Sequence, residues 1–366
     1  MKIALVHDYL KGEGGAEQVL LALHELFPQA PIYTLFADFK RDANFGQKYA
    51  RAKIVESWFA CLPLHARLIS PLRFLLPMLW RSFNFSSYDL VISSASWAIT
   101  KGFAQGKTKE ICYCHTPPRS LYGYDTSRDW RKNWLTRTYG LIVNHFLRLY
   151  DFEQAQKVTQ FVANSREVQK RIKKFYRRES VIISPPVDVF NIKGKVQNYF
   201  LTGGRLEKPK NFDLIIKACD RLKVNLKIYG VGPQEKYLRS LAGPTIKFVG
   251  GVNDQEKARL YADCRAYIVA QRDEDFGITP VEAMAAGRPV IAYRGGGYLE
   301  TVVEGETGEF FDKLTVESLV ETLRHYDDTN HRSIKPEDCR AQAEKFSKKK
   351  FKKAILELVA HYARTS

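Results

Sequence analysis

The sequence predicts an α/β protein with two domains, each built on a parallel sheet of the Rossmann type. Short apolar runs typical of buried strands alternate with helical patterns in both halves of the chain. Residues 2–7 precede a helical pattern over residues 16–26, and residues 199–202 precede another over residues 212–222. In each pair a glycine-rich turn separates strand from helix. A chain of 366 residues is long enough for two such cores.

A change in composition near the middle of the chain predicts the domain boundary. The strand-like run at residues 181–186 (VIISPP) ends in two prolines, and a polar stretch follows it. Proline cannot continue a central strand, so the first sheet should end there. We therefore expect a first domain over residues 1–186 and a second over residues 187–345, followed by a helix at residues 346–366.

The overall composition restricts the partners and the compartment. The formal net charge of +17 indicates an anionic partner, either phosphate-rich ligands, a membrane surface or nucleic acid. The six cysteines are scattered without a disulfide framework, which favours the reducing cytoplasm. The first residues run directly into a strand and do not resemble a signal peptide. The longest apolar run, residues 74–80, is far below the roughly 20 residues of a membrane-spanning helix.

In the first half, two places where a strand ends are candidate ligand contacts. The turn after residues 2–7 contains Gly14 and Gly15, whose backbone N–H groups no side chain would block from a phosphate. Glu17 stands where a dinucleotide-binding motif has its third glycine, so a dehydrogenase is not favoured; the alternative is a tight turn with Glu17 offsetting the helix dipole. In residues 110–119 (EICYCHTPPR), the strand should end at His115 because two prolines follow.

His115 would then lie at the carboxyl end of a parallel strand, which is where such sheets bind ligands. A buried structural histidine is the alternative. Arg119 is a candidate contact for a phosphate or an acceptor. In the second half, the turn after residues 199–202 carries Arg205 and Lys210, two cations able to reach a diphosphate. Solvated loop cations are the alternative for this pair.

Residues 271–303 form the densest functional pattern, with strand, charged loop, helix, strand and glycine turn in succession. A helix beginning near Phe276, Gly277 and Ile278 would offer N–H groups and its dipole to a diphosphate. Glu274 precedes this helix and Glu282 lies within it. Carboxylates suit the vicinal hydroxyls of a ribose or hexose, so the pattern suggests a nucleotide sugar. Dipole compensation by Glu282 and a solvated Glu274 are the alternative.

The run EDFGITPVEAMAAGRPVI contains Glu274 and Glu282 with seven residues between them. This pattern resembles the signature of the family 4 retaining glycosyltransferases, which have the GT-B fold. GRLEKPKN, with Arg205 and Lys210, and the Gly-Gly-x-Glu turn resemble further elements of that family. The resemblance implies two Rossmann-like domains facing a central cleft. It also implies that the helix at residues 346–366 crosses back to the first domain.

The resemblance assigns a role to each candidate residue. It implies that Glu274 and His115 lie beside the donor sugar, that Glu282 holds the ribose hydroxyls, and that Arg205 and Lys210 clamp the diphosphate. The start of the helix at Phe276, Gly277 and Ile278 would complete the donor site. Gly14 and Gly15 would face the donor diphosphate, with Glu17 and Arg119 on the acceptor side.

The implied reaction is the retaining transfer of a hexose from a nucleoside diphosphate to a hydroxyl, without cofactor or metal. The wording of HTPPR and EDFGITPVEAMA is most similar to bacterial mannosyltransferases of surface-polysaccharide (O-antigen) assembly. We therefore expect GDP-mannose as donor and a glycan acceptor, for example one linked to undecaprenyl diphosphate. A UDP-sugar donor, a nucleotide-sugar epimerase of the same fold and a non-catalytic nucleotide-sugar-binding module are the alternatives.

Two segments rich in apolar, aromatic and basic residues, 61–85 and 127–149, are typical of surfaces that lie against a membrane. The first could equally be an ordinary helix packed on a sheet. Aromatic and basic residues together are also found where proteins bind single-stranded nucleic acid, but no recognised nucleic-acid module accompanies the second segment. We expect a cytoplasmic protein associated peripherally with the anionic inner face of the membrane, and no nucleic-acid partner.

Overall fold

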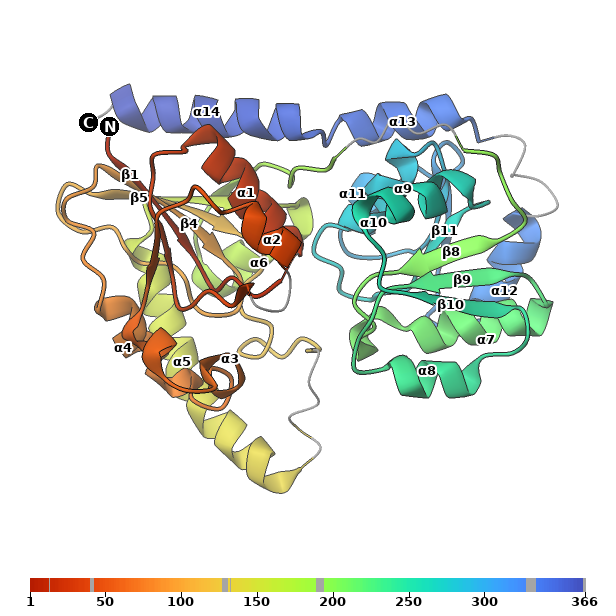
Figure 1. Cartoon of the computed structure of the whole chain (residues 1–366), viewed down its shortest axis with the longest axis horizontal. Helices are drawn as coiled ribbons and strands as arrows, with labels where there is room; N and C mark the ends of the chain where they lie inside the picture. The colour runs from red at the N-terminus through yellow and green to blue at the C-terminus, as the bar shows by residue number, and fades with distance from the viewer. Residues whose placement is uncertain are drawn as a thin grey trace. The chain divides into compact units, whose positions relative to one another are not determined.

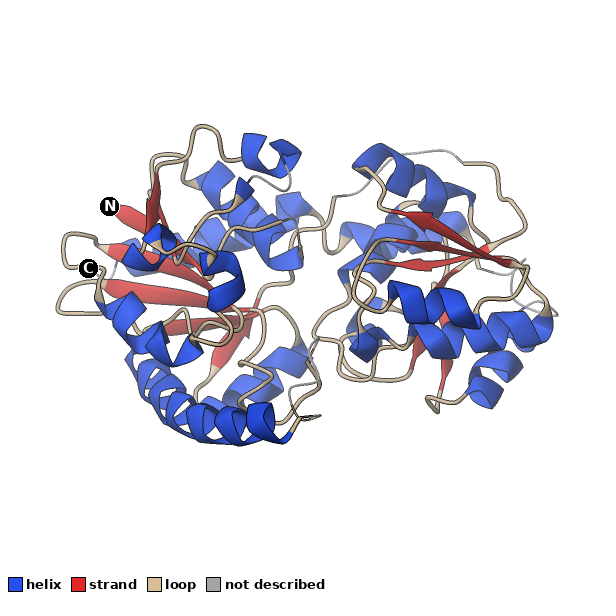
Figure 2. Cartoon of the chain, turned by 60° about the horizontal axis from the view of Figure 1, so that its bottom comes forward, coloured by secondary structure: helices blue, strands red, loops and turns tan. Residues whose placement is uncertain are grey.

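The computed structural model describes residues 1–12, 14–39, 43–126, 131, 133–188, 194–326 and 334–364. The chain divides into two compact units. The first unit comprises Met1–Pro186 and Lys349–Ser366, and the second comprises Val187–Lys348. Each unit contains one parallel sheet with helices on both of its faces (Figures 1 and 2).

The sheet of the first unit has seven strands in the order β3-β2-β1-β4-β5-β6-β7, and every pairing is parallel. The strands are β1 (Ile3–His7), β2 (Ile32–Thr34), β3 (Ile54–Glu56), β4 (Leu90–Ala95), β5 (Lys109–Cys114), β6 (Gln160–Ala163) and β7 (Ser180–Ile182). The order reverses between β1 and β4. In open α/β sheets, such a reversal is where ligands bind, at the carboxyl ends of the strands.

The helices of this unit cover apolar clusters on both faces of the sheet. They are α1 (Gly15–Leu26), α2 (Ala43–Gln47), α3 (His65–Leu68), α4 (Leu76–Arg81), α5 (Trp134–Lys157), α6 (Arg166–Tyr176) and α14 (Lys348–Arg364). Helix α14 returns to this unit from the end of the chain. Its residues Phe351, Ile355 and Val359 are buried in the same core as Leu5 of β1.

The two segments expected at a membrane differ in structure from each other. Residues 61–85 do not form the single helix that their composition suggests. They are divided among the end of a 3-10 turn (Trp58–Cys61), α3, a second 3-10 turn (Arg73–Leu75) and α4. Prolines at 63, 71 and 77 cause the interruptions, because proline lacks the N–H that continues a helix. The segment 127–149 falls mainly in α5, while residues 127–130 and 132 lie outside the described residues.

The sheet of the second unit has six parallel strands in the order β10-β9-β8-β11-β12-β13. The strands are β8 (Phe200–Gly203), β9 (Leu226–Tyr229), β10 (Ile246–Gly250), β11 (Tyr267–Val269), β12 (Val290–Tyr293) and β13 (Gly308–Phe311). The helices are α7 (Phe212–Leu222), α8 (Glu235–Leu241), α9 (Asp254–Asp263), α10 (Ile278–Ala285), α11 (Tyr298–Thr301), α12 (Val316–His325) and α13 (Pro336–Glu344).

This second order reverses between β8 and β11, just as the first reverses between β1 and β4. The predicted fold class, two Rossmann-like parallel-sheet domains, is thereby confirmed. In the part of the chain that the structure describes, every helix is too short or too polar to cross a bilayer.

Candidate active site

In the first unit, a chain of hydrogen bonds joins the carboxyl ends of three neighbouring strands. His7 is the last residue of β1, and its Nδ1 atom lies 3.0 Å from Ser94 Oγ on β4. Ser94 Oγ lies in turn 2.8 Å from Nε2 of His115, which directly follows β5. Strand register produces this alignment, since His7 pairs with Ser94 and the N–H of His115 donates to Ala95.

His115 is held as a neutral imidazole. Its side chain is only 9% exposed. Burial, together with the charge of His7, lowers the pKa of His115 to about 3. Asn164 Nδ2 donates to the carbonyl oxygen of His115 at 3.0 Å, which fixes the backbone at this point. Because Ser94 engages Nε2, Nδ1 is the ring nitrogen left for a hydrogen bond to a ligand.

The carboxylate of Glu17, in the first turn of α1, lies beside the glycine turn after β1. Gly14 adopts an extended backbone directly before α1, and Gly15 is the first residue of that helix. A Cβ atom on Gly14 would lie 2.7 Å from Glu17 Oε2, so a larger residue would require the end of the Glu17 side chain to move. Glu17 Oε1 also lies 3.7 Å from His7 Nε2. Glu17 therefore joins the helix start to the histidine network and offsets the helix dipole.

Arg119 lies on the same edge, in the turn that follows His115. Its carbonyl oxygen accepts the N–H groups of Tyr122 at 3.3 Å and Tyr124 at 3.1 Å, and its side chain is half-buried. Next to it, Thr116 Oγ1 accepts a hydrogen bond from Arg171 at 3.1 Å. Arg171 is buried and is also paired with Glu167 at 3.2 Å. This turn is thus braced from α6, a connection that sequence reasoning missed.

In the second unit, the turn after β8 presents two cations. Gly204 has a φ of +114°, a backbone conformation that favours glycine. The Nζ atom of Lys210 lies 3.1 Å from the point that a Cβ on Gly204 would occupy, so the ammonium group lies over the glycine turn. The Arg205 side chain is 65% exposed and lies 3.6 Å from Glu207. Because the Arg205 guanidinium is largely in solvent and 3.6 Å from the carboxylate, this pair is weak, and Arg205 can turn toward an anion.

Glu282 on α10 is fixed by two residues of α9. Its side chain is 4% exposed. Lys257 Nζ donates to Glu282 Oε1 at 3.0 Å, and the Tyr261 hydroxyl donates to Oε2 at 2.9 Å. Lys257 and Tyr261 lie one helical turn apart and therefore share a face of α9. Each carboxylate oxygen keeps a second lone pair, so Glu282 can still accept a hydrogen bond from a hydroxyl.

Behind Glu282, three buried tyrosines connect α10 to the glycine turn after β8. The Tyr261 hydroxyl lies 2.6 Å from that of Tyr229, which lies 3.4 Å from that of Tyr267. The Tyr267 hydroxyl donates to the carbonyl oxygen of Gly203 at 3.0 Å. Burial is the main cause that raises the pKa of all three phenols, so they stay neutral. We call this group the tyrosine chain.

Glu274 is positioned by the glycine turn at residues 295–297. The backbone N–H of Gly297 donates to the Glu274 carbonyl oxygen at 2.9 Å. The Tyr298 hydroxyl donates to Glu274 Oε2 at 3.3 Å. Burial and the charge of Glu274 raise the pKa of Tyr298, which keeps the phenol protonated as a donor. The half-buried carboxylate is therefore oriented but still accessible.

The start of α10 completes this edge. Gly277 is the N-cap residue, with a φ of +91° and no side-chain cap, so the N–H groups that follow are available to a ligand. The Phe276 side chain is buried, and its ring centroid lies 5.3 Å from that of Phe346. Only the backbone of Phe276 can therefore contact a ligand. Since β8 and β11 are neighbours in the sheet, Arg205, Lys210, Glu274 and the α10 start share one edge.

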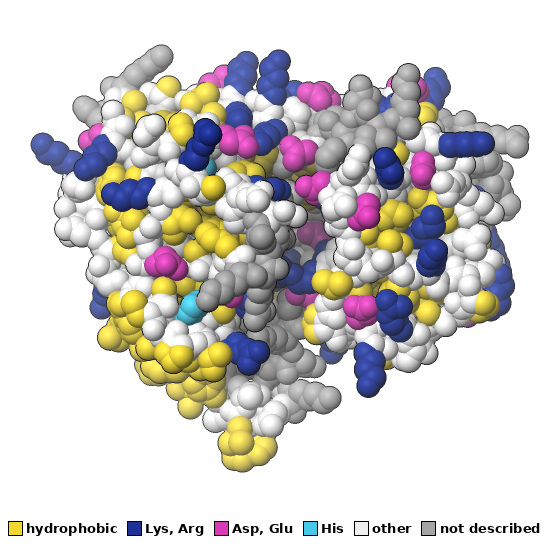
Figure 3. All heavy atoms as spheres, viewed as in Figure 1, with side chains coloured by type: hydrophobic (Ala, Val, Ile, Leu, Met, Phe, Trp, Pro, Cys, Tyr) yellow, Lys and Arg dark blue, Asp and Glu magenta, His cyan; other side chains and the backbone are white. Residues whose placement is uncertain are grey.

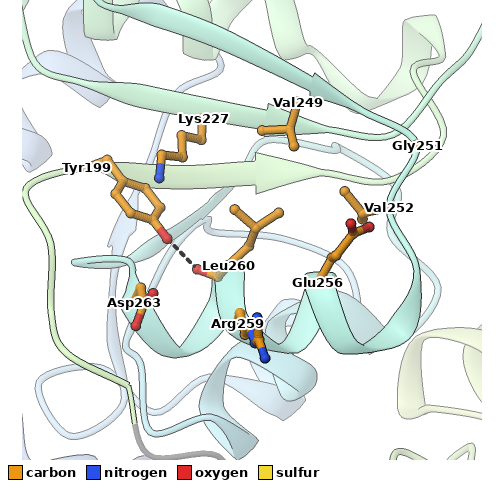
Figure 4. Close-up of a pocket in the computed structure, with 9 residues that line it drawn as sticks. All are labelled: Tyr199, Lys227, Val249, Gly251, Val252, Glu256, Arg259, Leu260 and Asp263. Atoms are coloured by element: carbon orange, nitrogen blue, oxygen red, sulfur yellow. Dashed lines mark hydrogen bonds between the residues drawn. The ribbon is translucent and has the colours of Figure 1, made fainter.

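A pocket of about 290 Å³ lies elsewhere in the second unit, between β9, β10 and α9 (Figure 4). Among its lining residues are Tyr199, Lys227, Glu256 and Asp263, and it contains none of the predicted site residues. Within the described ranges, no three His, Cys, Asp or Glu side chains are grouped to hold a metal ion. The metal independence expected from the sequence stays a prediction.

Two family models together match nearly the whole chain. The model described as Glycosyltransferase Family 4 matches residues 13–189, and the one described as Glycosyl transferases group 1 matches residues 188–346. The structure is similar to the crystal structure of Anabaena Alr3699/HepE in complex with UDP and glucose. The TM-score is 0.74 at 18% identity, covering 98% of this chain and 99% of that one. At this identity the likeness shows the fold alone.

Two curated relatives are mannosyltransferases. The alpha-1,3/1,6-mannosyltransferase ALG2 of Dictyostelium discoideum is 33% identical over 145 residues, which are 40% of this chain and 31% of that protein. The GDP-mannose-dependent alpha-mannosyltransferase of Corynebacterium glutamicum is 29% identical over 162 residues, 44% of this chain and 38% of that protein. The matched segments thus span about a third of the length of these relatives.

Proposed function

Because the chain belongs to the family 4 glycosyltransferases and has the GT-B fold, we propose that it transfers a hexose from a nucleoside diphosphate sugar to a glycan hydroxyl. The hexose in this proposal is mannose, and the donor is GDP-mannose. The two mannosyltransferase relatives support this donor. A UDP-sugar is the competing donor, since the similar HepE structure was solved with UDP.

The observation that carries the proposal is the arrangement of charge on the β8–β11 edge. Lys210 lies over the glycine turn and Arg205 is free to move toward an anion, so a diphosphate has two cationic partners there. Glu282 and Glu274 are held as oriented hydrogen-bond acceptors, which suits ribose and sugar hydroxyls. A nucleoside diphosphate sugar combines these two kinds of group.

The proposed chemistry rests on stabilising the leaving group. Negative charge develops on the diphosphate as the bond to the sugar breaks, and Arg205, Lys210 and the N–H groups at the start of α10 stabilise that charge. In this proposal these groups take the part that a metal ion would otherwise play, so the mechanism we propose is metal-independent. Attack and departure on one face of the sugar would retain the anomeric configuration. His115, as a neutral imidazole, would hydrogen-bond the donor sugar.

The remaining candidates of the first unit complete the proposal. Gly14 and Gly15 would face the donor diphosphate, and Glu17 and Arg119 would contact the acceptor. The acceptor would be a lipid-linked glycan of bacterial surface-polysaccharide synthesis, reached from the cytoplasmic face of the membrane. The net charge of +17 supports an anionic membrane surface as partner.

Thermal unfolding with GDP, UDP, ADP and TDP, each without added metal, tests the donor. Ligands that bind only the folded state raise the unfolding temperature. We expect GDP to give the largest shift and the Lys210→Met variant to lose most of it. Transfer of labelled mannose from GDP-mannose to a lipid-linked glycan then tests the activity. A higher unfolding temperature with UDP alone would identify a UDP-sugar as the donor in place of GDP-mannose. If no nucleotide raised the unfolding temperature, the proposed donor site would be contradicted.

A further inference from the structure

Helix α5 has most of its large apolar side chains on its exposed face, whereas its buried face carries several polar side chains besides Leu147 and Ala155. The exposed set, which we call the α5 ridge, consists of Trp134, Leu135, Leu141, Ile142, Phe146, Leu149 and Phe152. The buried set consists of Gly140, Asn144, Leu147, Asp151, Gln154 and Ala155. Each set recurs at intervals close to the helical period, so the two lie on opposite sides. A helix on the surface of a water-soluble domain normally shows the reverse pattern.

The polar contacts of the inner face fix this orientation. Asp151 forms a buried ion pair with Lys101 and accepts a hydrogen bond from the Tyr122 hydroxyl at 2.7 Å. Asn144 Nδ2 donates to the carbonyl oxygen of Ser120 at 3.1 Å. Turning α5 to bury its apolar side chains would leave Asp151 and Lys101 uncompensated in the interior, which is strongly unfavourable. The exposure of the α5 ridge is therefore built into the fold.

The segment beside α5 extends the apolar surface. The Tyr139 hydroxyl donates to the carbonyl oxygen of Pro71, and the Arg81 guanidinium lies 5.9 Å from the Tyr150 ring centroid. These contacts place α4 and the 3-10 turn before it along α5. Phe74 in that turn is 49% exposed and Met78 in α4 is 60% exposed. In Figure 3, apolar side chains gather where Figure 1 draws α3, α4 and α5.

The charges around this surface are mainly positive, with the exposed Glu153 of α5 as an exception. The sequence contains no Asp or Glu from residue 57 to 88 or from residue 131 to 150. The arginines of these stretches are Arg67, Arg73, Arg81, Arg131, Arg137 and Arg148. Arg73 stacks 5.7 Å from the Tyr139 ring, and its buried Nε atom has no hydrogen-bond partner among the described residues. Apolar side chains bordered by arginines are complementary to an anionic lipid headgroup layer.

We propose that the α5 ridge, with Phe74 and Met78, inserts into the surface of an anionic phospholipid bilayer. The apolar side chains enter the boundary between headgroups and acyl chains, and the neighbouring arginines contact lipid phosphates. At about 1.5 Å per residue, a helix of this length lies in the plane of the interface over roughly 35 Å. The inference deepens the proposed function by identifying the surface that would bring the enzyme to a lipid-linked acceptor.

Sedimentation with vesicles tests this surface without any sugar substrate, so its outcome is independent of the transferase assay. The full chain is mixed with vesicles of phosphatidylcholine alone, or of phosphatidylcholine with phosphatidylglycerol. We expect binding to the anionic vesicles that weakens as salt is raised. The double variant Ile142→Ser/Phe146→Ser should lose at least about tenfold in affinity, because two apolar side chains no longer enter the lipid.

The matched control is Val196→Ser/Leu356→Ser, which removes two side chains that are 54% and 46% exposed outside this surface. It should bind anionic vesicles as the unchanged protein does. Cooperative thermal unfolding of all three proteins without any ligand, at similar temperatures, would show that each is folded. The proposal is overturned if the unchanged protein does not sediment with anionic vesicles, or if the Ile142→Ser/Phe146→Ser variant binds them undiminished. A dimer that only this variant dissociates, without vesicle binding, would instead assign the surface to a second copy of the chain.

Discussion

The two units have the same strand order at their ligand-binding edges but opposite side-chain chemistry. In the first unit, His7, Ser94 and His115 form a buried hydrogen-bonded network. In the second, Arg205 and Lys210 stand on the turn after β8, and Glu274 and Glu282 follow β11. The fold thus forms an equivalent ligand-binding edge in each unit, and the side chains at that edge determine what it can bind.

Burial explains how the two edges differ in behaviour. His115 is 9% exposed and cannot change its contacts without disturbing the sheet, whereas the Arg205 side chain is 65% exposed. A buried network that ends in the neutral His115 suits fixed hydrogen bonds to an uncharged sugar. Cations at the surface suit an anion whose charge increases during the reaction. Substitutions in the second unit should therefore affect the reaction more strongly than substitutions in the first.

The largest effect is expected when Lys210 is replaced by methionine. The ammonium group over the glycine turn is removed while the side-chain volume is kept, so charge on the leaving diphosphate loses one partner. We expect kcat to fall by about 10²–10³, measured with saturating donor. Lys217→Met is the control, since Lys217 lies on α7 of the same unit and is 49% exposed. A decrease no larger than that of the control would remove Lys210 from the site.

Replacing Glu282 by glutamine should weaken donor binding next. The amide cannot offer two acceptor oxygens, and Lys257 loses the closer of its two carboxylate partners, so we expect the donor KM to rise by about tenfold. The free energy of unfolding should fall by about 1–3 kcal/mol. The double variant Lys257→Met/Glu282→Gln separates the two effects, because it should recover stability but not donor affinity. Recovery of both would mean that Glu282 serves the fold alone.

The pH dependence of stability tests the first unit. The pKa of His115 is about 3 in the fold against 6.5 for the ordinary group, so below pH 6.5 the unfolded chain binds a proton that the folded ring does not. Stability should therefore decrease toward acid, by about 2 kcal/mol between about pH 7 and pH 5. In the His115→Asn variant, the free energy of unfolding should decrease less between these two pH values, because this titrating group is absent. Parallel curves for the two proteins in denaturant titrations at each pH would contradict the assignment.

The elements themselves were largely predictable from local patterns. Helix α7 has the predicted bounds at residues 212–222, because its apolar spacing and its position after a glycine turn are local signals. Helix α5 was not predicted, because most of its large apolar residues face outward and its inner face carries several polar residues. The composition of the segment indicated a surface, but its spacing did not indicate a helix packed on a sheet. The interruptions of residues 61–85 follow from prolines that the overall composition obscured.

The candidate site was predictable only where it follows strands and motifs. His115, Arg205 and Glu274 each come shortly after a strand-like run, and the structure places them at strand ends. Their roles in binding and catalysis stay predictions. The partners Ser94, Lys257 and Tyr261 could not be inferred, because they are more than twenty residues from the groups that they hold. Strand register and helix packing create these contacts, and one sequence does not display them.

The smallest effect belongs to the tyrosine chain, where the second unit also contains a buried neutral network. Tyr261→Phe removes the hydroxyl that holds Glu282 and should raise the donor KM by about fivefold, equivalent to about 1 kcal/mol. Tyr199→Phe is the matched control, because the Tyr199 hydroxyl donates to Leu260 on the same helix at 2.9 Å, outside the tyrosine chain. Tyr261→Phe loses the hydrogen bonds to Glu282 and Tyr229 and Tyr199→Phe loses one, so Tyr261→Phe should lose somewhat more stability. If the donor KM changes in Tyr261→Phe and not in Tyr199→Phe, the buried network of the second unit positions a charged group, Glu282, whereas that of the first unit ends in the neutral His115. If the donor KM is the same in both variants, the tyrosine chain has a structural role only, and a buried network contributes to ligand binding in the first unit alone.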